Sequence, residues 1–216
     1  MVRLLSVVLL LILCGTLPAR AHPHVSIDAR VALGVDGKGR LETVAITWTF
    51  DEIYSAYSVE GYQRDKAGHP DPAALEAMIA QAMIDLRDWD YFTELKIGGQ
   101  RQTWGEVRAH EARWEAGRLI YRFTLALAAP TSLRAVAPTL SLRVYDPTYY
   151  IAILLEDKPG AAQIIPALPP CVAQIRPPMG LRETMIDDAV ALAETIEPGQ
   201  EGLGAPFAET IGVVCQ

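Results

Sequence analysis

Two histidines near the amino end of the chain have the spacing of metal ligands. His22 and His24 are two residues apart, so in a strand both side chains point to the same side. Neutral imidazoles are common ligands of zinc, copper, nickel and cobalt. Cleavage before His22 would add its α-amine as a third donor. Pro23 has no amide hydrogen, which excludes the square-planar amino-terminal copper and nickel chelate that needs one.

A predicted hairpin brings carboxylates to the same point. Apolar residues alternate over 25–35 and again over 44–50, with turn residues at 36–39. If Val35 pairs with Arg40, both apolar faces enter one core and His24 lies opposite Asp51; a register shifted by two residues places His22 there instead. Either register predicts a site with ligands from His22, His24, Asp51 and Glu52. The alternative is an ordinary surface pair without metal.

The other polar groups give weaker signals. Asp146 lies in the segment Tyr145-Asp146-Pro147-Thr148-Tyr149-Tyr150, which favours a turn packed by tyrosines; alternatively, Asp146 reaches the same sheet end as Asp51 and joins the metal ligands. His69 is interpreted as a loop histidine and His110 as a solvated strand residue. The chain has no phosphate-binding loop and no nucleophile motif, so we expect a protein that is not an enzyme.

The elements that position these residues predict an α+β fold. Besides the hairpin, strands are expected at 95–97, 106–114, 119–127, 140–144 and 150–155, with shorter ones near Val172 and Val213. A helical insertion is expected at about 52–90, because Asp71-Pro72 starts an apolar stripe of helical spacing. A second stripe, from Met185 to Ile196, predicts one C-terminal helix. We expect an antiparallel, sandwich-like sheet.

The first 21 residues have the features of a cleaved signal peptide. Arg3 precedes the apolar run 4–13, and Ala19-Arg20-Ala21 is a cleavage pattern. This predicts a single periplasmic domain, 22–216, that does not span the membrane. Removing Arg3 and Arg20 from the 19 basic residues leaves 17 against 26 acidic residues, a net charge of −9, which argues against nucleic acid as a partner. Cys171 and Cys215 remain as an even pair, and we expect a disulfide; a thiolate metal site is the alternative.

Several segments together resemble a known family. They are the start His22-Pro23-His24-Val25, the segment Thr47 to Glu52 with Tyr54-Ser55, Tyr91-Phe92-Thr93, the tyrosine-rich segment around Asp146, and Phe207-Ala208-Glu209 to Cys215. The chain resembles, over nearly its whole mature length, an uncharacterised domain-of-unknown-function family of exported bacterial proteins. Its members are labelled periplasmic components of an uncharacterised ABC-type transport system. They are often encoded beside nickel/cobalt-type permeases, and the resemblance implies handling of a divalent metal.

Relatives often have a loop similar to an EF-hand before the helix at Asp71. Here the ligand positions hold Gln63, Asp65, Ala67, His69, Asp71 and Ala74. At most three of the oxygen ligands are retained, and calcium needs six to eight, so we expect no calcium.

Together these observations predict a periplasmic accessory or solute-binding component of a transport system, handling one divalent transition metal ion of the nickel, cobalt or zinc class and working with a membrane permease. One alternative is a ligand-free interaction module that docks on the permease. Another is a copper carrier that uses the N-terminal histidine.

Overall fold

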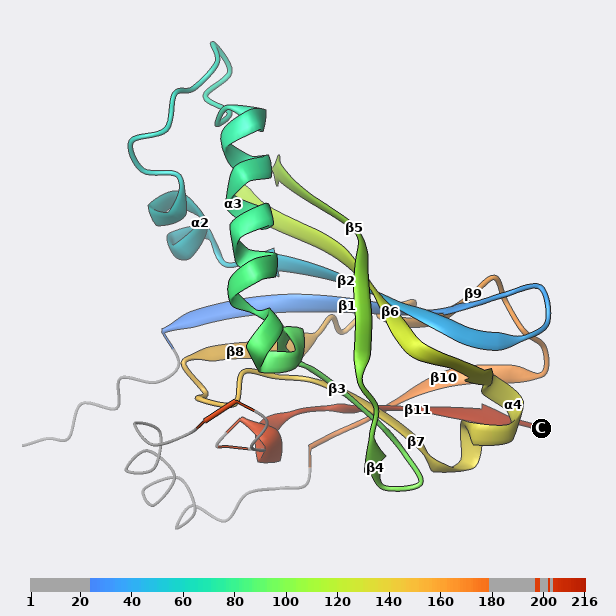
Figure 1. Ribbon diagram of the computed structural model, residues 1–216. Helices are drawn as coiled ribbons and strands as arrows, with labels where there is room; N and C mark the ends of the chain where they lie inside the picture. The colour runs from blue at the N-terminus through green and yellow to red at the C-terminus, as the bar shows by residue number, and fades with distance from the viewer. Residues whose placement is uncertain (1–23, 179–196, 199–201, 203) are drawn as a thin grey trace, which may run out of the picture.

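Two β-sheets form the protein (Figure 1). The computed structural model describes residues 24–178, 197–198, 202 and 204–216. The larger sheet has the order β5 (Trp104–Glu115), β6 (Arg118–Ser132), β2 (Arg40–Phe50), β1 (Val25–Val35), β8 (Ile151–Leu155), and β9 (Ala162–Ile165) also pairs with β1. The smaller sheet has the order β10 (Cys171–Arg176), β11 (Thr210–Cys215), β7 (Leu140–Val144), β3 (Thr93–Ile97), β4 (Gln100–Arg101). Apart from β8 and β9, which run parallel to β1, the strand pairs are antiparallel.

The buried core contains residues from both sheets. Every second residue of β1 is buried, and the residues between are exposed or half-buried, as the sequence alternation predicts. Ile27 and Leu33 of the larger sheet belong to the same buried cluster as Leu142 and Ile211 of the smaller one. The predicted α+β class is therefore confirmed, and the strands form two mostly antiparallel sheets.

The predicted helical insertion lies between β2 and β3. It consists of α2 (Glu52–Ser58), α3 (Pro72–Asp85) and the 3-10 segment η1 (Arg87–Phe92). The Asp71 carboxylate accepts the N–H of Ala73 at the start of α3, as expected for an N-cap. Leu75, Ile79 and Met83 of the predicted stripe are buried, and α3 packs beside β5 (Figure 1). Short helical turns also occur at α4 (Leu133–Val136), η2 (Ala137–Thr139) and η4 (Ala205–Phe207).

The carboxyl end is a strand, as expected near Val213, and not a helix. The chain ends in strand β11, which pairs with β10, and the segment 185–196 with the predicted helix lies outside the described residues. Cys171 and Cys215 face each other in this pair and form the predicted disulfide. Residues 1–21, the predicted signal peptide, also lie outside the described part. Among the described residues, no helix has the length and apolar content to cross a bilayer.

The hairpin register assumed for the metal site is wrong by two residues. The Asp36 carboxylate accepts the N–H groups of Lys38 and Arg40, and the Asp36 N–H donates to the Arg40 carbonyl, which closes the turn one residue tighter than expected. Val35 consequently pairs with Leu41, and an irregularity at the next pair adds one more residue on β2. This second shift returns the apolar residues of β2 to the core face.

Candidate functional site

The amino end of β1 holds one of the two predicted histidine ligands. His24 is exposed, and its N–H donates to the Tyr150 carbonyl at 2.9 Å. The His24 and Tyr150 rings are 4.7 Å apart between centroids. His22 lies outside the described residues.

Asp51 is held by backbone groups. Because of the shifted register, Asp51 lies across from Ser26, whose N–H donates to its Oδ2 at 2.8 Å, and Oδ1 accepts the N–H of Tyr54 at 2.8 Å as the N-cap of α2. Burial acts to raise the pKa of Asp51. The hydrogen bonds from these backbone N–H groups have the larger combined effect, so the pKa lies below its ordinary value. The neighbouring Glu52 is exposed in the first turn of α2. Asp51 thus begins a helix and fixes the end of the hairpin.

Asp146 occupies the same end of the larger sheet. Its Oδ1 accepts the N–H of Thr148 at 2.8 Å, and its Oδ2 accepts the N–H of Ile151 at 3.0 Å, the first residue of β8. Ile151 pairs with Val25 of β1, so Asp51 and Asp146 flank the start of this strand. Within the ranges that the structure describes, no three His, Cys, Asp or Glu side chains form a group suited to a metal ion.

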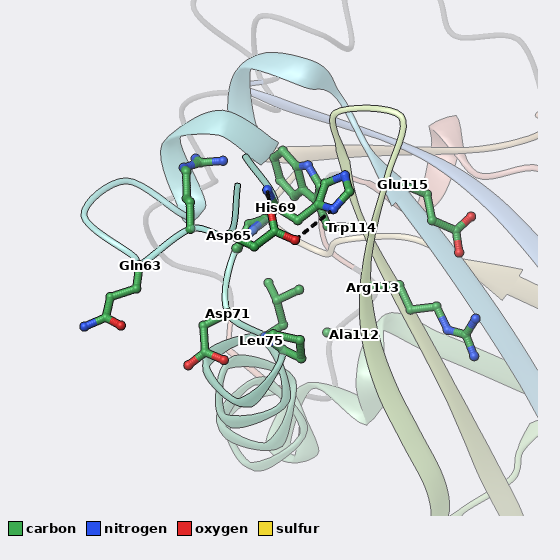
Figure 2. Close-up of a pocket in the computed structure, with 12 residues that line it drawn as sticks. Gln63, Asp65, His69, Asp71, Leu75, Ala112, Arg113, Trp114 and Glu115 are labelled. Carbon is green, nitrogen blue, oxygen red and sulfur yellow. Dashed lines mark hydrogen bonds and ion pairs between the residues drawn. The ribbon is translucent and has the colours of Figure 1, made fainter. Parts of the chain in front are cut away.

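An open cavity of about 590 Å³ lies elsewhere, beside the start of α3. One wall is the loop from Gln63 to Asp71, and the other is the end of β5 (Figure 2). Buried Leu75 forms part of its floor. The lining residues are Gln63, Arg64, Asp65, His69, Pro70, Asp71, Pro72, Leu75, Ala112, Arg113, Trp114 and Glu115. This volume falls within the usual range for small-molecule sites.

Asp65 gives the loop its shape. Its Oδ1 accepts the N–H groups of Ala67 at 2.8 Å and of His69 at 2.9 Å. The His69 N–H bond is the main cause that lowers the pKa of Asp65. Gly68 has a φ of +82° between them, a conformation that glycine adopts without strain. The loop therefore keeps its shape through bonds of its own.

His69 and Asp65 form a pair of metal-type donors at this cavity. His69 Nδ1 lies 3.4 Å from Asp65 Oδ2, and the two side chains are 58% and 57% exposed. Gln63 and Asp71, two other positions of the EF-hand-like loop, point away from this pair (Figure 2). From the sequence, His69 was interpreted as a loop histidine, and both His69 and Asp65 fell at ligand positions of the degenerate EF-hand-like loop. Their four-residue separation was the available signal for the pair, but that spacing has no defined geometry outside a helix.

A positive charge from the loop lies against an aromatic ring from β5. The Arg64 guanidinium lies 5.7 Å from the centroid of the Trp114 ring, a cation–π distance. Arg64 also donates to the Gly68 carbonyl, and Arg113 donates to Glu111 at 2.9 Å. The cavity thus offers an imidazole and a carboxylate on the loop, an apolar floor and the Arg64 guanidinium, while Arg113 points away from the loop (Figure 2) and the carboxylates of Asp71 and Glu115 also belong to the lining.

A buried charge cluster was missed by the sequence analysis. Glu94 on β3 is 3% exposed, and its carboxylate accepts from Arg101 at 2.6 Å and from Arg143 at 2.9 Å. Two of the segments that carried the family resemblance meet beside it, since the Tyr145 N–H donates to the Phe92 carbonyl at 2.8 Å. The two arginines come from β4 and β7, so only the pairing of these strands with β3 brings them to Glu94.

Comparison with known proteins identifies a distant relative and a family. An uncharacterized protein of Haemophilus influenzae is 25% identical to this chain over 203 residues, which cover 91% of this chain and 92% of that protein. A family model described as protein of unknown function, DUF1007, matches residues 7–215. With nearly the whole length matched, the chain belongs to the DUF1007 family.

Proposed function

We propose that the protein is a periplasmic solute-binding or accessory component of a transport system. Its cargo contains a divalent transition metal ion of the nickel, cobalt or zinc class. The cavity beside α3 receives this cargo. The observation that carries the proposal is the His69–Asp65 pair at a cavity of about 590 Å³. The resemblance to exported proteins often encoded beside nickel/cobalt-type permeases supports the same class of cargo.

The available donors fit borderline metals better than soft ones. Imidazole nitrogen suits zinc, nickel and copper, whereas thiolates select the softest ions. Cys171 and Cys215 are joined in a disulfide, which leaves imidazole and carboxylate as donors. A transport component with such a site would release the ion to a membrane permease.

The N-terminal histidines are a second location for the metal. His24 is exposed at the head of β1, and His22 follows directly after the predicted cleavage position. Two imidazoles and a terminal amine would supply three donors there.

Calorimetric titration with Zn²⁺, Ni²⁺ and Co²⁺ separates the two locations, using protein exported to the periplasm with its native terminus. We expect His69→Ala to weaken binding about tenfold or more, equivalent to about 1.4 kcal/mol, and His110→Ala, the matched control, to leave it unchanged. Loss of metal binding in His24→Ala but not in His69→Ala would place the metal at the amino terminus. Equal binding by wild type and by both variants would contradict a metal-handling function.

The second candidate function is a ligand-free module that docks on a membrane permease. Helix α2 favours this function. Its Ile53 and Tyr57 are 85% and 73% exposed, and they lie on one helical face because they are four residues apart. In cells that contain the permease, a photo-crosslinker at position 53 or 57 should give a permease adduct. A crosslinker at exposed Ile84 on α3 is the control. Equal adducts at all three positions would argue against docking through α2.

A further inference from the structure

We propose that the outer face of the smaller sheet is a docking surface for acidic polypeptide, and that residues 183–201 of the same chain occupy it. Three features of the molecule lead to this assignment, and none of them involves a metal. They are the positive charge of the face, the composition of the stretch 183–201, and the two places where the connecting chain leaves and rejoins the fold.

The smaller sheet has one buried face and one outer face. The core-facing residues of β3, β7 and β11 belong to the buried cluster, so the residues that alternate with them point outward. Cross-strand pairs place these outward residues side by side across β4, β3, β7, β11 and β10. They include four cationic side chains and one carboxylate, which are Lys96, Arg101, Arg143, Arg176 and Glu94.

This outer face carries an excess of positive charge. Glu94 accepts from Arg101 at 2.6 Å and from Arg143 at 2.9 Å. Asp90, beside the face, also accepts from Arg101, at 2.8 Å. Glu209, directly before β11, is directed toward β8 instead, where it accepts a backbone N–H at 2.7 Å. Four cations minus the carboxylates of Glu94 and Asp90 leave a charge of +2, whereas the predicted mature chain as a whole carries −9.

The cationic groups lie where an acidic segment can meet them. Arg176 is exposed, and a Cβ atom at Gly212 would lie 2.5 Å from its Nη2, so the guanidinium is held over the sheet. The side chains of Lys96 and Arg101 are 24% and 29% exposed. The planar fork of a guanidinium matches the two oxygens of a carboxylate. The face therefore favours carboxylate-bearing polypeptide.

The stretch 183–201 has the complementary charge. It contains six carboxylates and no Lys, Arg or His, and the six are Glu183, Asp187, Asp188, Glu194, Glu197 and Glu201. Most of this stretch lies outside the described ranges, and its sequence alone supplies the charge. A charge of −6 opposite a charge of +2 favours association and suppresses neutral or basic partners.

Both ends of the connecting chain lie at the same face. Strand β10 ends at Arg176, and the chain is described again at η4, where Arg143 Nη1 donates to the Ala205 carbonyl at 3.4 Å. A stretch tethered at both ends has an effective concentration of about millimolar beside the face. A separate polyanion, such as nucleic acid or an anionic bilayer, lacks this tether and is repelled by the negative charge of the whole chain. These two differences favour the chain's own stretch as the occupant.

A photo-crosslinker at Ser141, an outward residue of β7 that pairs with Lys96, tests the docking in the full exported chain. We expect adducts of monomer mass that peptide mapping places within 183–201. A crosslinker at Thr47, on the outer face of the larger sheet, is the matched control and should give no adduct with that stretch. Salt at about 0.5 M should reduce the Ser141 adduct, because it screens the charges. Neutralising the stretch by Glu183→Gln/Asp187→Asn/Asp188→Asn/Glu194→Gln should reduce the adduct as well.

Hydrogen exchange followed by mass spectrometry gives an independent measurement. Amides of residues 183–196 should exchange about fivefold faster in Arg176→Glu than in wild type, the factor that corresponds to about 1 kcal/mol. Lys38→Glu makes the same change of charge in the exposed turn between β1 and β2 and should leave the exchange unchanged.

Three results would overturn the proposal. Ser141 adducts that map outside 183–201 would identify a different occupant. Adducts of twice the monomer mass would assign the face to a second copy of the chain. Equal exchange of residues 183–196 in wild type, in Arg176→Glu and in the neutralised variant would show that the cationic face does not hold this stretch.

Discussion

Four aspartate side chains accept hydrogen bonds from backbone N–H groups close to them in the sequence. Asp51, Asp65, Asp71 and Asp146 each accept at least one N–H group of a residue two to five positions ahead in the chain. A short carboxylate reaches its own backbone more easily than a distant ligand. The sequence analysis recognised this role at Asp71, where Pro72 follows, and favoured a turn at Asp146. At Asp51 a specific metal geometry was predicted, and it depended on a register that the structure does not have.

Asp51→Ala tests the helix-cap role. The change removes the acceptor for both the Ser26 and the Tyr54 N–H groups, so the free energy of unfolding should fall by about 2 kcal/mol. Urea unfolding followed by circular dichroism measures the loss. Asp71→Ala, which removes one longer bond of 3.2 Å to Ala73, is the matched control and should lose about half as much. Equal losses would contradict a double role for Asp51.

Glu94 should make stability depend on pH. Burial raises its pKa, but hydrogen bonds from Arg143 and Arg101 outweigh burial and hold the pKa below its ordinary value. Its contribution is therefore fully present above the unfolded value of about 4.3 and is lost as the pH falls through the lower folded value. Glu94→Gln should lower the free energy of unfolding at pH 7 by about 3 kcal/mol. This difference should shrink toward pH 3.

The matched control for Glu94 is Glu111, which also accepts from two arginines, Arg113 and Arg122. The Glu111 side chain is 40% exposed, against 3% for Glu94. Solvent screens an exposed pair, so Glu111→Gln should change the free energy of unfolding by less than about 1 kcal/mol. Chemical unfolding at pH 7 and pH 3 compares both variants. Similar losses at the two sites would show that burial does not strengthen the Glu94 cluster.

At the scale of the elements, the alternation of apolar and polar residues predicted where the strands lie but not how they pair. Most of the predicted strands and the start of α3 lie within a few residues of those observed, because burial on one face imposes a period of two or 3.6 residues. The register of β1 and β2 depended instead on how Asp36 folds its own turn and on an added residue in β2. Parallel pairing of β8 and β9 with β1 is also set by tertiary contacts, which alternation does not encode.

Gly204 joins the carboxyl-terminal segment to the turn between β7 and β8. A Cβ atom at Gly204 would lie 1.9 Å from the Asp146 carbonyl oxygen, a backbone atom that cannot rotate away. Gly204→Ala should therefore lower the free energy of unfolding by about 2 kcal/mol through overpacking. Thermal unfolding tests this, with Gly37→Ala as the control, since a Cβ there meets no atom within 4 Å. Equal melting temperatures for both variants would mean that the turn moves at little cost.

At the scale of the whole molecule, the candidate site depends on contacts between residues that are far apart in the sequence. The loop at 63–71 and the end of β5 are about 45 residues apart in sequence, and the packing of α3 beside β5 brings them to one cavity. Composition and charge predicted a globular domain that avoids nucleic acid, but a cavity between distant segments has no local pattern. His69 and Asp65 could be identified from sequence only as loop residues, because the opposite wall belongs to another element.

The disulfide is the property of the whole chain that sequence analysis predicted most directly. It joins paired residues of β10 and β11 across a separation of 44 positions, and closing a loop of that size restricts the unfolded chain by about 4 kcal/mol in the chain-entropy model. Cys171→Ser/Cys215→Ser should therefore unfold at lower urea concentration than wild type. If the first 21 residues, which include Cys14, are cleaved as predicted, the mature chain should contain no alkylatable thiol under non-reducing conditions, by intact-mass measurement. Two alkylated cysteines in native protein would contradict the disulfide and restore the thiolate metal site as the alternative.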